Sequence, residues 1–399
     1  MNRAELDCTA LIIDSGVQIC QRLFNMNPSI RELFKVTEKY SYLNSAAVSP
    51  VPITAIEAVV SQMQDVAGNG SKNYQDWVDT KNRARALLAS MLSVRPDQVA
   101  FTRNTSDGFA TIANGLKWKT GDNIVSFAGE FPANFYPWRR IRDEFGVELR
   151  LVSEVAGRVD VNALIDAIDS NTRVVSISAV QFASGFRADL ERIGRAARAV
   201  DALFCVDIIQ GLGARSFDLP TEFVDAACGA SHKWLCAPEG CGYIFLSDRA
   251  RERVDPTLTG WISVEDPWNF VDREQSLKPT ALAWESGTGP AALFYGLEQS
   301  LKLLTDTGLD EIERYLDTLT DHLCESLAGS NYEIVSSRSD GEKSAIVCIK
   351  SLAGIHPNQI AATLEQANVI VSPRIDRIRI APHFYNDVSD IDRLIEALP

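Results

Sequence analysis

Apolar strand-like segments alternate with helical segments between about residue 97 and residue 250, and this alternation constrains the fold most strongly. Strands that alternate with helices form βαβ units, so the pattern predicts a mostly parallel sheet with helices on both faces. Such sheets bind ligands at the carboxyl ends of their strands. The expected strands are 98–102, 123–127, 147–152, 172–177, 202–206 and 242–246, and the expected helices are 106–117, 134–145, 161–169 and 189–201.

The pattern changes near residue 290, which predicts a second domain. A Gly/Pro break at 285–290 separates the alternating region from two amphipathic helical segments, several short strand segments and a last helical segment. We therefore expect an N-terminal extension at 1–40 that contributes to the small domain, a large domain at 41–288, and a small α+β domain at 289–399. In the small domain the expected helices are 291–305, 309–328 and 387–397, and the expected strands lie near 332–336, 344–350, 368–372 and 377–380.

Composition and charge narrow the class of protein. The 399 residues include 39 Lys and Arg against 53 Asp and Glu, a formal net charge of −14, which argues against nucleic-acid and anionic-membrane partners. No apolar run approaches the roughly 18 residues of a membrane span, and Asp7 and Asp14 flank the only apolar run near the start. Eight cysteines without a CxxC pair indicate reduced thiols in a cytoplasmic protein. Four histidines without Cys/His spacing make a metal site unexpected.

Two polar residues are candidates for chemistry, and the first of them stands where the predicted sheet opens at its ligand-binding edge. Asp207 directly follows the apolar strand at 202–206, and Lys233 follows later, between a histidine and a Trp-Leu pair. Taken singly, Asp207 could cap the next turn, and Lys233 could lie along the surface. Together they are the groups that pyridoxal phosphate (PLP) needs. A desolvated amine can form a Schiff base with its aldehyde, and an acid can keep its ring nitrogen protonated.

Thr105 and Ser106 are candidates for holding the cofactor's phosphate. They follow the strand at 98–102 and open the next helix. Backbone N–H groups at a helix N-terminus bind anions, and the two hydroxyls add further donors. An ordinary helix cap has the same composition, so both interpretations stay open at this point.

Seven segments resemble the class V aminotransferase family, which includes cysteine desulfurases, kynureninase, isopenicillin-N-epimerase-like proteins and serine–glyoxylate-type transaminases. The resemblance runs from about residue 40 to the C-terminus and keeps the order and spacing of the motifs. It implies the aspartate aminotransferase-like fold of PLP-dependent transferases (fold type I), an amino-acid substrate and a homodimer. The segments are Tyr42–Ala47, Asn104–Gly108, Glu130–Trp138, Asp207-x-x-Gln210, Ser231–Trp234, Glu285–Thr288 and Ile378–Asn386.

The resemblance also implies a role for each matching residue. Lys233 would carry the cofactor as a Schiff base and shuttle protons at Cα. Asp207 would pair with the ring nitrogen, Gln210 would bind the phenolic oxygen, and Phe131 would stack on the ring. The phosphate would be held by Thr105, Ser106 and His232, with Ser231 beside them. Thr288 and Trp261 would reach the partner's site, although Trp261 could equally be a packing residue. Asn44 and Ala46 lie in the segment that resembles the family's substrate-side turn.

The substrate carboxylate needs an anchor, and a bidentate arginine suits that geometry. Arg379 matches the position used by kynureninase and serine–glyoxylate-type relatives. Arg374 is the second candidate, because the desulfurase arginine aligns ambiguously there. A surface salt bridge on a small-domain strand is the alternative for either residue.

Three departures from the desulfurase pattern bear on the reaction. Phe131 replaces a ring-stacking histidine, Phe182 or a neighbour replaces an asparagine, and the stretch from Val369 to His383 lacks the mobile-loop cysteine that accepts sulfur. The nearest preceding cysteine, Cys348, lies in an apolar strand. A transaminase is therefore the main prediction, with a cysteine desulfurase-like C–S lyase or an amino-acid epimerase as the alternative.

Two other classes of protein compete with a PLP enzyme. A dinucleotide-dependent oxidoreductase needs a Gly-x-Gly-x-x-Gly between a strand and a helix, and Gly211-Leu212-Gly213 comes near it, but Ser216 stands at the third glycine. A non-catalytic binding protein on a decayed enzyme fold would not be expected to keep Asp207, Gln210 and Lys233.

Overall fold

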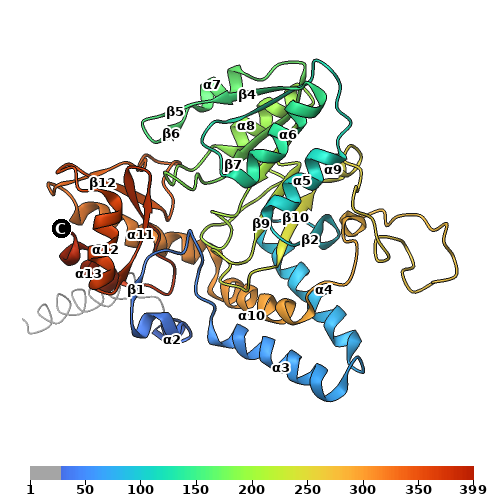
Figure 1. Ribbon diagram of the computed structural model, residues 1–399, viewed down its shortest axis with the longest axis horizontal. Coiled ribbons are helices and arrows are strands. Elements are labelled where there is room, and N and C mark those ends of the chain that lie inside the picture. The colour runs from blue at the N-terminus through green and yellow to red at the C-terminus, as the bar shows by residue number, and fades with distance from the viewer. Residues whose placement is uncertain (1–27) are drawn as a thin grey trace, which may run out of the picture.

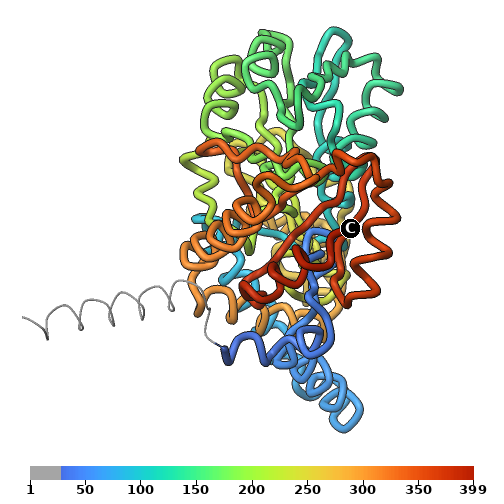
Figure 2. The backbone as a smooth tube through the Cα atoms, turned by 90° about the vertical axis from the view of Figure 1, so that its left-hand side faces the viewer, coloured from blue at the N-terminus to red at the C-terminus, as the bar shows by residue number. Residues whose placement is uncertain are grey.

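A computed structural model describes residues 28–399 (Figure 1). The first 27 residues of the predicted N-terminal extension, with Cys8 and Cys20, lie outside the described residues. A large domain carries the central sheet, and a smaller domain, drawn in red, lies beside it. Figure 2 shows the small domain in front of the large one, with the chain from residue 28 onward running close to both.

The central sheet has seven strands in the order β2-β10-β9-β8-β7-β3-β4. All neighbouring pairs are parallel except those of β10, which runs antiparallel to β2 and β9. The predicted mostly parallel sheet is therefore confirmed. The strands are β2 (Val99–Thr102), β3 (Asn123–Phe127), β4 (Glu148–Val152), β7 (Thr172–Ser178), β8 (Leu203–Asp207), β9 (Ala226–Ala230) and β10 (Gly242–Leu246).

Helices cover both faces of the sheet, because successive strand residues point to opposite sides. In β8, Phe204 and Val206 join the core that contains α4 (Tyr74–Met91), α8 (Leu190–Ala199) and α10 (Ala291–Thr307). Leu203 and Cys205 join the opposite core, which contains α5 (Thr105–Gly115) and α6 (Tyr136–Phe145). A short helix, α7 (Val161–Asp166), and a hairpin of β5 (Glu154–Val155) and β6 (Arg158–Val159) complete this part.

The small domain has its own four-stranded antiparallel sheet, in the order β11-β12-β15-β14. Its core is built from apolar side chains of these strands and of α11, α12 and α13. The elements are α11 (Leu309–Ser326), β11 (Tyr332–Ile334), β12 (Val347–Ser351), α12 (Pro357–Gln366), β13 (Val369–Ile370), β14 (Ser372–Arg374), β15 (Arg377–Ile380) and α13 (Val388–Ala397).

The segment before the large domain is tied to the small one. It contains α2 (Pro28–Glu32), where Arg31 donates to Asp390 of α13 at 2.6 Å, and β1 (Ser41–Tyr42), which pairs with β13. Helix α10 packs instead against α4 and α3 (Ile53–Asn69). The predicted domain boundaries at 40 and 288 stay predictions, because contacts cross both of them.

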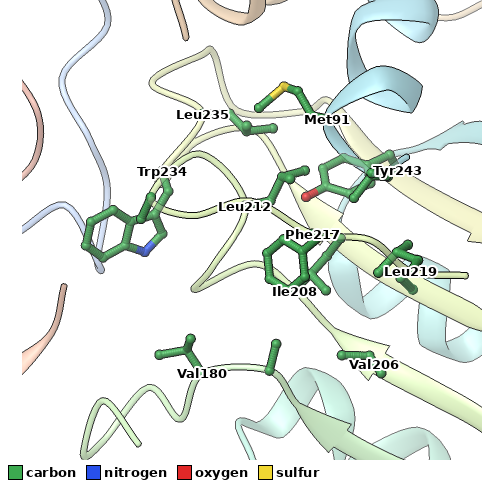
Figure 3. Close-up of a cluster of buried hydrophobic side chains, with 14 of the residues drawn as sticks. Met91, Val180, Val206, Ile208, Leu212, Phe217, Leu219, Trp234, Leu235 and Tyr243 are labelled. Carbon is green, nitrogen blue, oxygen red and sulfur yellow. The ribbon is translucent and has the colours of Figure 1, made fainter. Parts of the chain in front are cut away.

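Loops at the carboxyl ends of β8 and β9 are buried under apolar side chains. Figure 3 shows Ile208, Leu212 and Phe217 from the segment after β8 close to Leu235 from the turn after β9. Gly213 lies in this contact at φ +104°, and a Cβ there would meet the Trp234 carbonyl oxygen at 2.1 Å. No helix follows Gly211-Leu212-Gly213, so this stretch is a packing turn and not a dinucleotide-binding loop.

The six cysteines of the described part are free thiols, and five of them are buried. Within residues 28–399, no helix has the length and apolar character of a membrane span, and no three His, Cys, Asp or Glu side chains gather as metal ligands would.

Candidate active site

Lys233 lies in the turn that follows β9, at the carboxyl edge of the parallel strands. Its side chain is 8% exposed, and no hydrogen bond or ion pair to its amine occurs among residues 28–399. Burial lowers the pKa of Lys233 to about 8; Asp207 opposes this shift, and Arg379 and Arg374 add to it. A neutral amine is the nucleophilic form, so this environment suits a lysine that attacks a carbonyl carbon.

Asp207 is the last residue of β8 and is almost fully buried. One carboxylate oxygen, Oδ1, accepts a hydrogen bond from the Ile209 N–H at 2.9 Å. Burial raises the pKa of Asp207 to about 7, and Glu130 adds to the rise, while the Ile209 hydrogen bond and Lys233 lower it. A cationic partner would restore the charged form of this carboxylate, and a protonated pyridine nitrogen is such a partner.

The start of α5 offers an anion site. Asn104 caps the helix by accepting from the Asp107 N–H at 2.9 Å. No hydrogen bond of the described residues satisfies the backbone N–H of Thr105 or Ser106. The Thr105 hydroxyl is buried without a partner, whereas Ser106 is exposed. Unsatisfied donors at a helix N-terminus favour a bound anion such as a phosphate.

Phe131 places an aromatic ring over the lysine. The Lys233 Nζ lies 5.2 Å from the centroid of this ring. The ring is 38% exposed and meets Phe182 edge-on, with centroids 5.1 Å apart. The two phenyl rings form an apolar wall beside the amine, which an aromatic ligand could contact.

Arg379 brings a buried positive charge to the same site from β15. It is 1% exposed, and its Nη1 donates to the Phe182 carbonyl at 3.0 Å. Its Nε and Nη2 are buried without partners, and burial lowers its pKa to about 9, with a further contribution from Arg374. Arg374, on β14, is less buried and donates to the Pro373 carbonyl at 2.9 Å. Free guanidinium donors inside a protein are stabilised by a carboxylate.

Residues 41–373 match the class-V aminotransferase family. The chain belongs to this family.

Curated relatives include proteins named as cysteine desulfurases and proteins named as aminotransferases. A probable cysteine desulfurase of Methanothermobacter thermautotrophicus is 26% identical over 398 residues, covering 94% of this chain and 98% of the relative. An uncharacterized aminotransferase of Schizosaccharomyces pombe is 27% identical over 328 residues, covering 81% of this chain and 82% of the relative. The family resemblance of the sequence is therefore confirmed.

Solved structures share the fold. The apo cysteine desulfurase of Thermococcus onnurineus superposes with a TM-score of 0.84 at 22% identity, covering 94% of this chain and 98% of that one. The cystine C–S lyase C-DES, in complex with cysteine persulfide, gives 0.82 at 22% identity, covering 90% and 98%. These likenesses establish PLP fold type I, as predicted.

The residues of this family member fit PLP. Among residues 28–399, the buried amine of Lys233 and one oxygen of Asp207 have no hydrogen-bond partner, and the buried Thr105 hydroxyl has none either. These are the three kinds of group that a pyridine aldehyde with a phosphate would engage. In a variant of the C-DES lyase, glycine is covalently linked to the PLP cofactor. Family and fold together imply PLP as the cofactor here.

Other residues expected near the cofactor already have partners. Gln210 donates from Nε2 to the Ala46 carbonyl at 3.0 Å and accepts from the Trp234 indole at 2.9 Å. The Ser231 hydroxyl donates to the Pro238 carbonyl, which closes the lysine turn. Through these contacts, Gln210, Ala46 and Ser231 help to position the segments around Lys233. Their contacts to the cofactor or the substrate stay predictions.

His232 and Asn44 keep free polar atoms. His232 is partly buried; burial lowers its pKa, and Lys233 lowers it further. The Asn44 Oδ1 is buried without a partner, on a segment whose backbone bridges to Ala381 next to β15. A ring N–H of His232 can therefore donate to a phosphate, and the Asn44 Oδ1 can accept a new hydrogen bond.

Thr288 and Trp261 lie on the surface, outside the cluster around Lys233. Thr288 is exposed, and Trp261 is 38% exposed with its ring 5.3 Å from Trp268. The loop that carries Thr288 is fixed by Glu285, which accepts from Arg85 at 2.6 Å and from Lys81 at 2.5 Å. Burial alone would raise the pKa of Glu285, but these two cations hold it at about 2.

Sequence reasoning missed two buried residues that position the site. Glu130 accepts from the Ser178 and Gln181 side chains and from the Ser178 N–H, which fixes the turn before Phe131. The Nδ1 of His383 accepts a hydrogen bond from the Phe384 N–H. The proton of the ring therefore lies on Nε2, which donates to the Trp234 carbonyl at 2.9 Å. Each lies within a motif segment, Glu130 directly beside Phe131, but no pattern in the sequence indicates which backbone groups they hold.

Proposed function

We propose that this chain is a PLP-dependent carbon–sulfur lyase that acts on a sulfur-containing α-amino acid. One observation supports an α-amino acid as the substrate. The unpaired amine of Lys233 shares a buried site with the unpaired guanidinium donors of Arg379. The guanidinium suits the substrate carboxylate, and the amine suits proton removal at the adjacent Cα. The relatives named as cysteine desulfurases support cleavage of a carbon–sulfur bond. They favour this reaction over transamination, which is the main prediction from the sequence.

Each residue of the chain has a defined task in this proposal. PLP, when bound, supplies an electron sink for the charge that develops at Cα. Asp207 keeps a proton at the ring nitrogen, and α5 holds the phosphate through Thr105 and Ser106. Arg379 holds the carboxylate, and Lys233 takes the Cα proton. Phe131 and Phe182 exclude water from one side of the site.

Sulfur leaves as a small molecule in this proposal, and not as a persulfide on the enzyme. Cys348 is fully buried, and burial raises the pKa of its thiol to about 11, so it carries little thiolate at neutral pH. Cys236 and Cys241, near Lys233 in sequence, are also buried, and burial raises the pKa of each to about 12. With L-cysteine the balanced reaction takes up water and gives pyruvate, ammonia and hydrogen sulfide, without any external oxidant or reductant.

A homodimer is part of the proposal. Trp261, Trp268 and Phe270 form a chain of exposed ring contacts on the segment that precedes Thr288. Exposed aromatic clusters of this kind are typical of protein interfaces. We propose that a second copy covers these rings and that Thr288 and Trp261 then reach its cofactor site.

The deciding experiment is product analysis of the purified holoenzyme with L-cysteine, L-cystine and a panel of other amino acids. A C–S lyase releases pyruvate together with sulfide or a persulfide, while the visible spectrum stays that of the pyridoxal form. Alanine with sulfur bound to protein would indicate a desulfurase. Conversion to the pyridoxamine form would indicate a transaminase, and loss of optical purity alone would indicate an epimerase. A protein that stays colourless with added PLP would overturn the proposal entirely.

A further inference from the structure

A second cleft, of about 760 Å³, lies between the large and small domains. Its walls are the β5–β6 hairpin, the start of α7, the segment 186–192, the residues Arg215 and Glu222, and the small-domain turn 340–342. Figure 1 shows the hairpin on the same side of the molecule as the red small domain. None of the residues proposed above to hold PLP or substrate lines this cleft.

Arg215 is a buried cation in this cleft that forms no ion pair within residues 28–399, although the carboxylates of Glu313, Glu222 and Asp317 act on its charge from farther away. It is 8% exposed, its Nη1 is buried without a hydrogen bond, and no ion pair of Arg215 occurs in the described part of the chain. Its guanidinium stacks on Phe217, 4.9 Å from the ring centroid. Burial lowers the pKa of Arg215 to about 10 and Arg187 lowers it further, whereas Glu313, Glu222 and Asp317 act in the opposite direction.

Glu222 is the matching anion on the same cleft. Its Oε2 is buried, and no residue of the described part of the chain donates a hydrogen bond to it. Burial raises the pKa of Glu222 to about 7, although Arg215 and Arg187 act in the opposite direction. Among residues 28–399, no ion pair joins Glu222 to Arg215. Two opposite charges therefore face one cleft without touching.

Most other charged residues of the cleft already have partners within the protein. Arg158 pairs with Glu342, Glu191 pairs with Arg195, and Arg187 pairs with Glu313. Asp160 and Asp189 cap α7 and α8 through backbone N–H groups. The unsatisfied pair of Arg215 and Glu222 is thus a specific feature of the cleft and not a general excess of charge.

We propose that this cleft is a second, non-catalytic site for a small zwitterion of the α-amino-acid class. Arg215 binds its carboxylate, and Glu222 binds its ammonium group. A zwitterion satisfies both buried charges at once, whereas a lone anion or cation leaves one of them unpaired. A polyanion such as phosphate is opposed by the wall itself, which carries six carboxylates and four arginines.

Calorimetric titration of the holoenzyme tests the site. The protein is first treated with borohydride so that no ligand reacts at Lys233, and each common L-amino acid is then titrated in turn. Propionate and butylamine, which carry one charge each, serve as half-ligands, and inorganic phosphate serves as the polyanion. We expect at least one amino acid to bind, and to bind at least about tenfold more tightly than either half-ligand.

Variants locate that binding. Glu222→Gln and Arg215→Gln should each weaken it at least about tenfold, because each removes one charge-assisted contact. Glu191→Gln makes the same chemical change at a carboxylate already paired with Arg195, and should leave the affinity unchanged. Arg379→Gln should also leave it unchanged, which separates this cleft from the substrate site. If Arg215→Gln fails to fold, Glu222→Gln alone decides.

The proposal is overturned if no amino acid binds the treated protein, or if binding survives Glu222→Gln. It is also overturned if binding is lost in Arg379→Gln, since the ligand then occupies the substrate site. Phosphate binding that depends on Arg215 but not on Glu222 would mean an anion site, and would overturn the amino-acid class.

Discussion

At the scale of single residues, the candidate site is marked by charged side chains that the fold buries. Lys233, Asp207 and Arg379 each have atoms that the protein leaves unsatisfied. Burying such groups costs several kcal/mol unless they are paired, so these unpaired side chains lower the stability of the fold. Unsatisfied buried charges of complementary sign are therefore the strongest indication of what this site binds.

Lys233→Ala should reduce turnover at least about a thousandfold, because the chain offers no second amine at this position. The variant should fold, and its melting temperature without cofactor should equal or exceed that of the wild type, since a buried unpaired cation is removed. Activity assays and thermal unfolding measure both. Lys302→Ala, at an exposed lysine of α10 that pairs with Asp306, is the control; equal activity in the Lys233 variant and in the wild type would disprove the central role.

Arg379→Gln should raise the KM for the amino-acid substrate at least about thirtyfold, because losing one partner of a buried charge pair costs roughly 2–5 kcal/mol. Arg374→Gln should raise it only a few fold, since Arg374 is less buried. Steady-state kinetics on both variants give the comparison. The opposite ranking would place the carboxylate anchor at Arg374.

At the scale of elements, the lysine turn is held from two sides. Gly213, after β8, packs on the carbonyl of Trp234, and His383, after β15, donates to the same carbonyl. Lys233 is thus positioned by the large domain and by the C-terminal segment together. The position of the Ser231–Trp234 segment therefore depends on segments far away in the chain.

Gly213→Ala should destabilise the protein by more than about 2 kcal/mol and weaken cofactor binding, because its Cβ would meet the Trp234 oxygen at 2.1 Å. Gly354→Ala is a matched control, with a positive φ of 73° and no atom within 4 Å of the added Cβ. It should cost only about 1–2 kcal/mol and leave the cofactor spectrum intact. Equal effects in urea unfolding would contradict a specific role for Gly213.

His383 should make the protein sensitive to acid. Burial lowers the pKa of His383 to about 4, from an ordinary value of 6.5. The unfolded chain therefore binds this proton first, and the stability contributed by neutral His383 is complete above pH 6.5 and is lost as the pH falls towards 4. Between pH 7 and pH 5 the loss is about 2 kcal/mol.

The variant His383→Leu isolates this contribution from those of other groups. It should be less stable than the wild type at pH 7, because the Trp234 carbonyl loses its donor. The difference in unfolding free energy should shrink by about 2 kcal/mol at pH 5, where the wild-type histidine has lost most of its advantage. Urea unfolding at the two pH values gives this difference, and a constant difference would mean that His383 is not held neutral.

At the scale of the whole molecule, both domains contribute residues to the candidate site, and an aromatic segment of the large domain is exposed. Arg379 comes from the small-domain sheet, and Lys233 and Asp207 come from the large one. Trp268 and Phe270 are 58% and 60% exposed, on the segment that precedes Thr288. A surface of this kind is costly in water unless another chain covers it.

The holoenzyme should be a dimer in light scattering, and Trp268→Arg should shift it towards the monomer, because a charge is then buried in the interface. Activity should fall with the dimer if Thr288 completes the partner's site. Leu352→Arg makes a similar change at an exposed leucine of the small domain and should leave the dimer intact. A monomeric wild type would remove the cross-subunit role of Thr288 and Trp261.

Much of the large domain was predictable because its strands are continuous apolar runs. Strands at 123–127 and 242–246 have the predicted bounds. The expected strands at 98–102, 147–152 and 172–177 differ from the observed ones by one residue at one end, and the strand expected at 202–206 is shifted by one residue to 203–207. Strand β9 has no counterpart among the predictions, because Ala226–Ala230 is made of small residues with little strand propensity. Its small side chains admit α5, since a Cβ at Gly108 would meet the Cys228 sulfur at 2.7 Å.

The sequence by itself determined the family and the mostly parallel sheet, and it predicted Asp207 and Lys233 as the pair for the chemistry, because local apolar patterns and motif spacing express these directly. Only the tertiary structure showed that Arg379 is buried beside Lys233, that Glu130 and His383 hold the turns of the site, and that Arg215 and Glu222 face a second cleft. These facts depend on burial and on contacts between residues far apart in the chain. A side chain's partners are set by the packing of the whole fold, which no local pattern records.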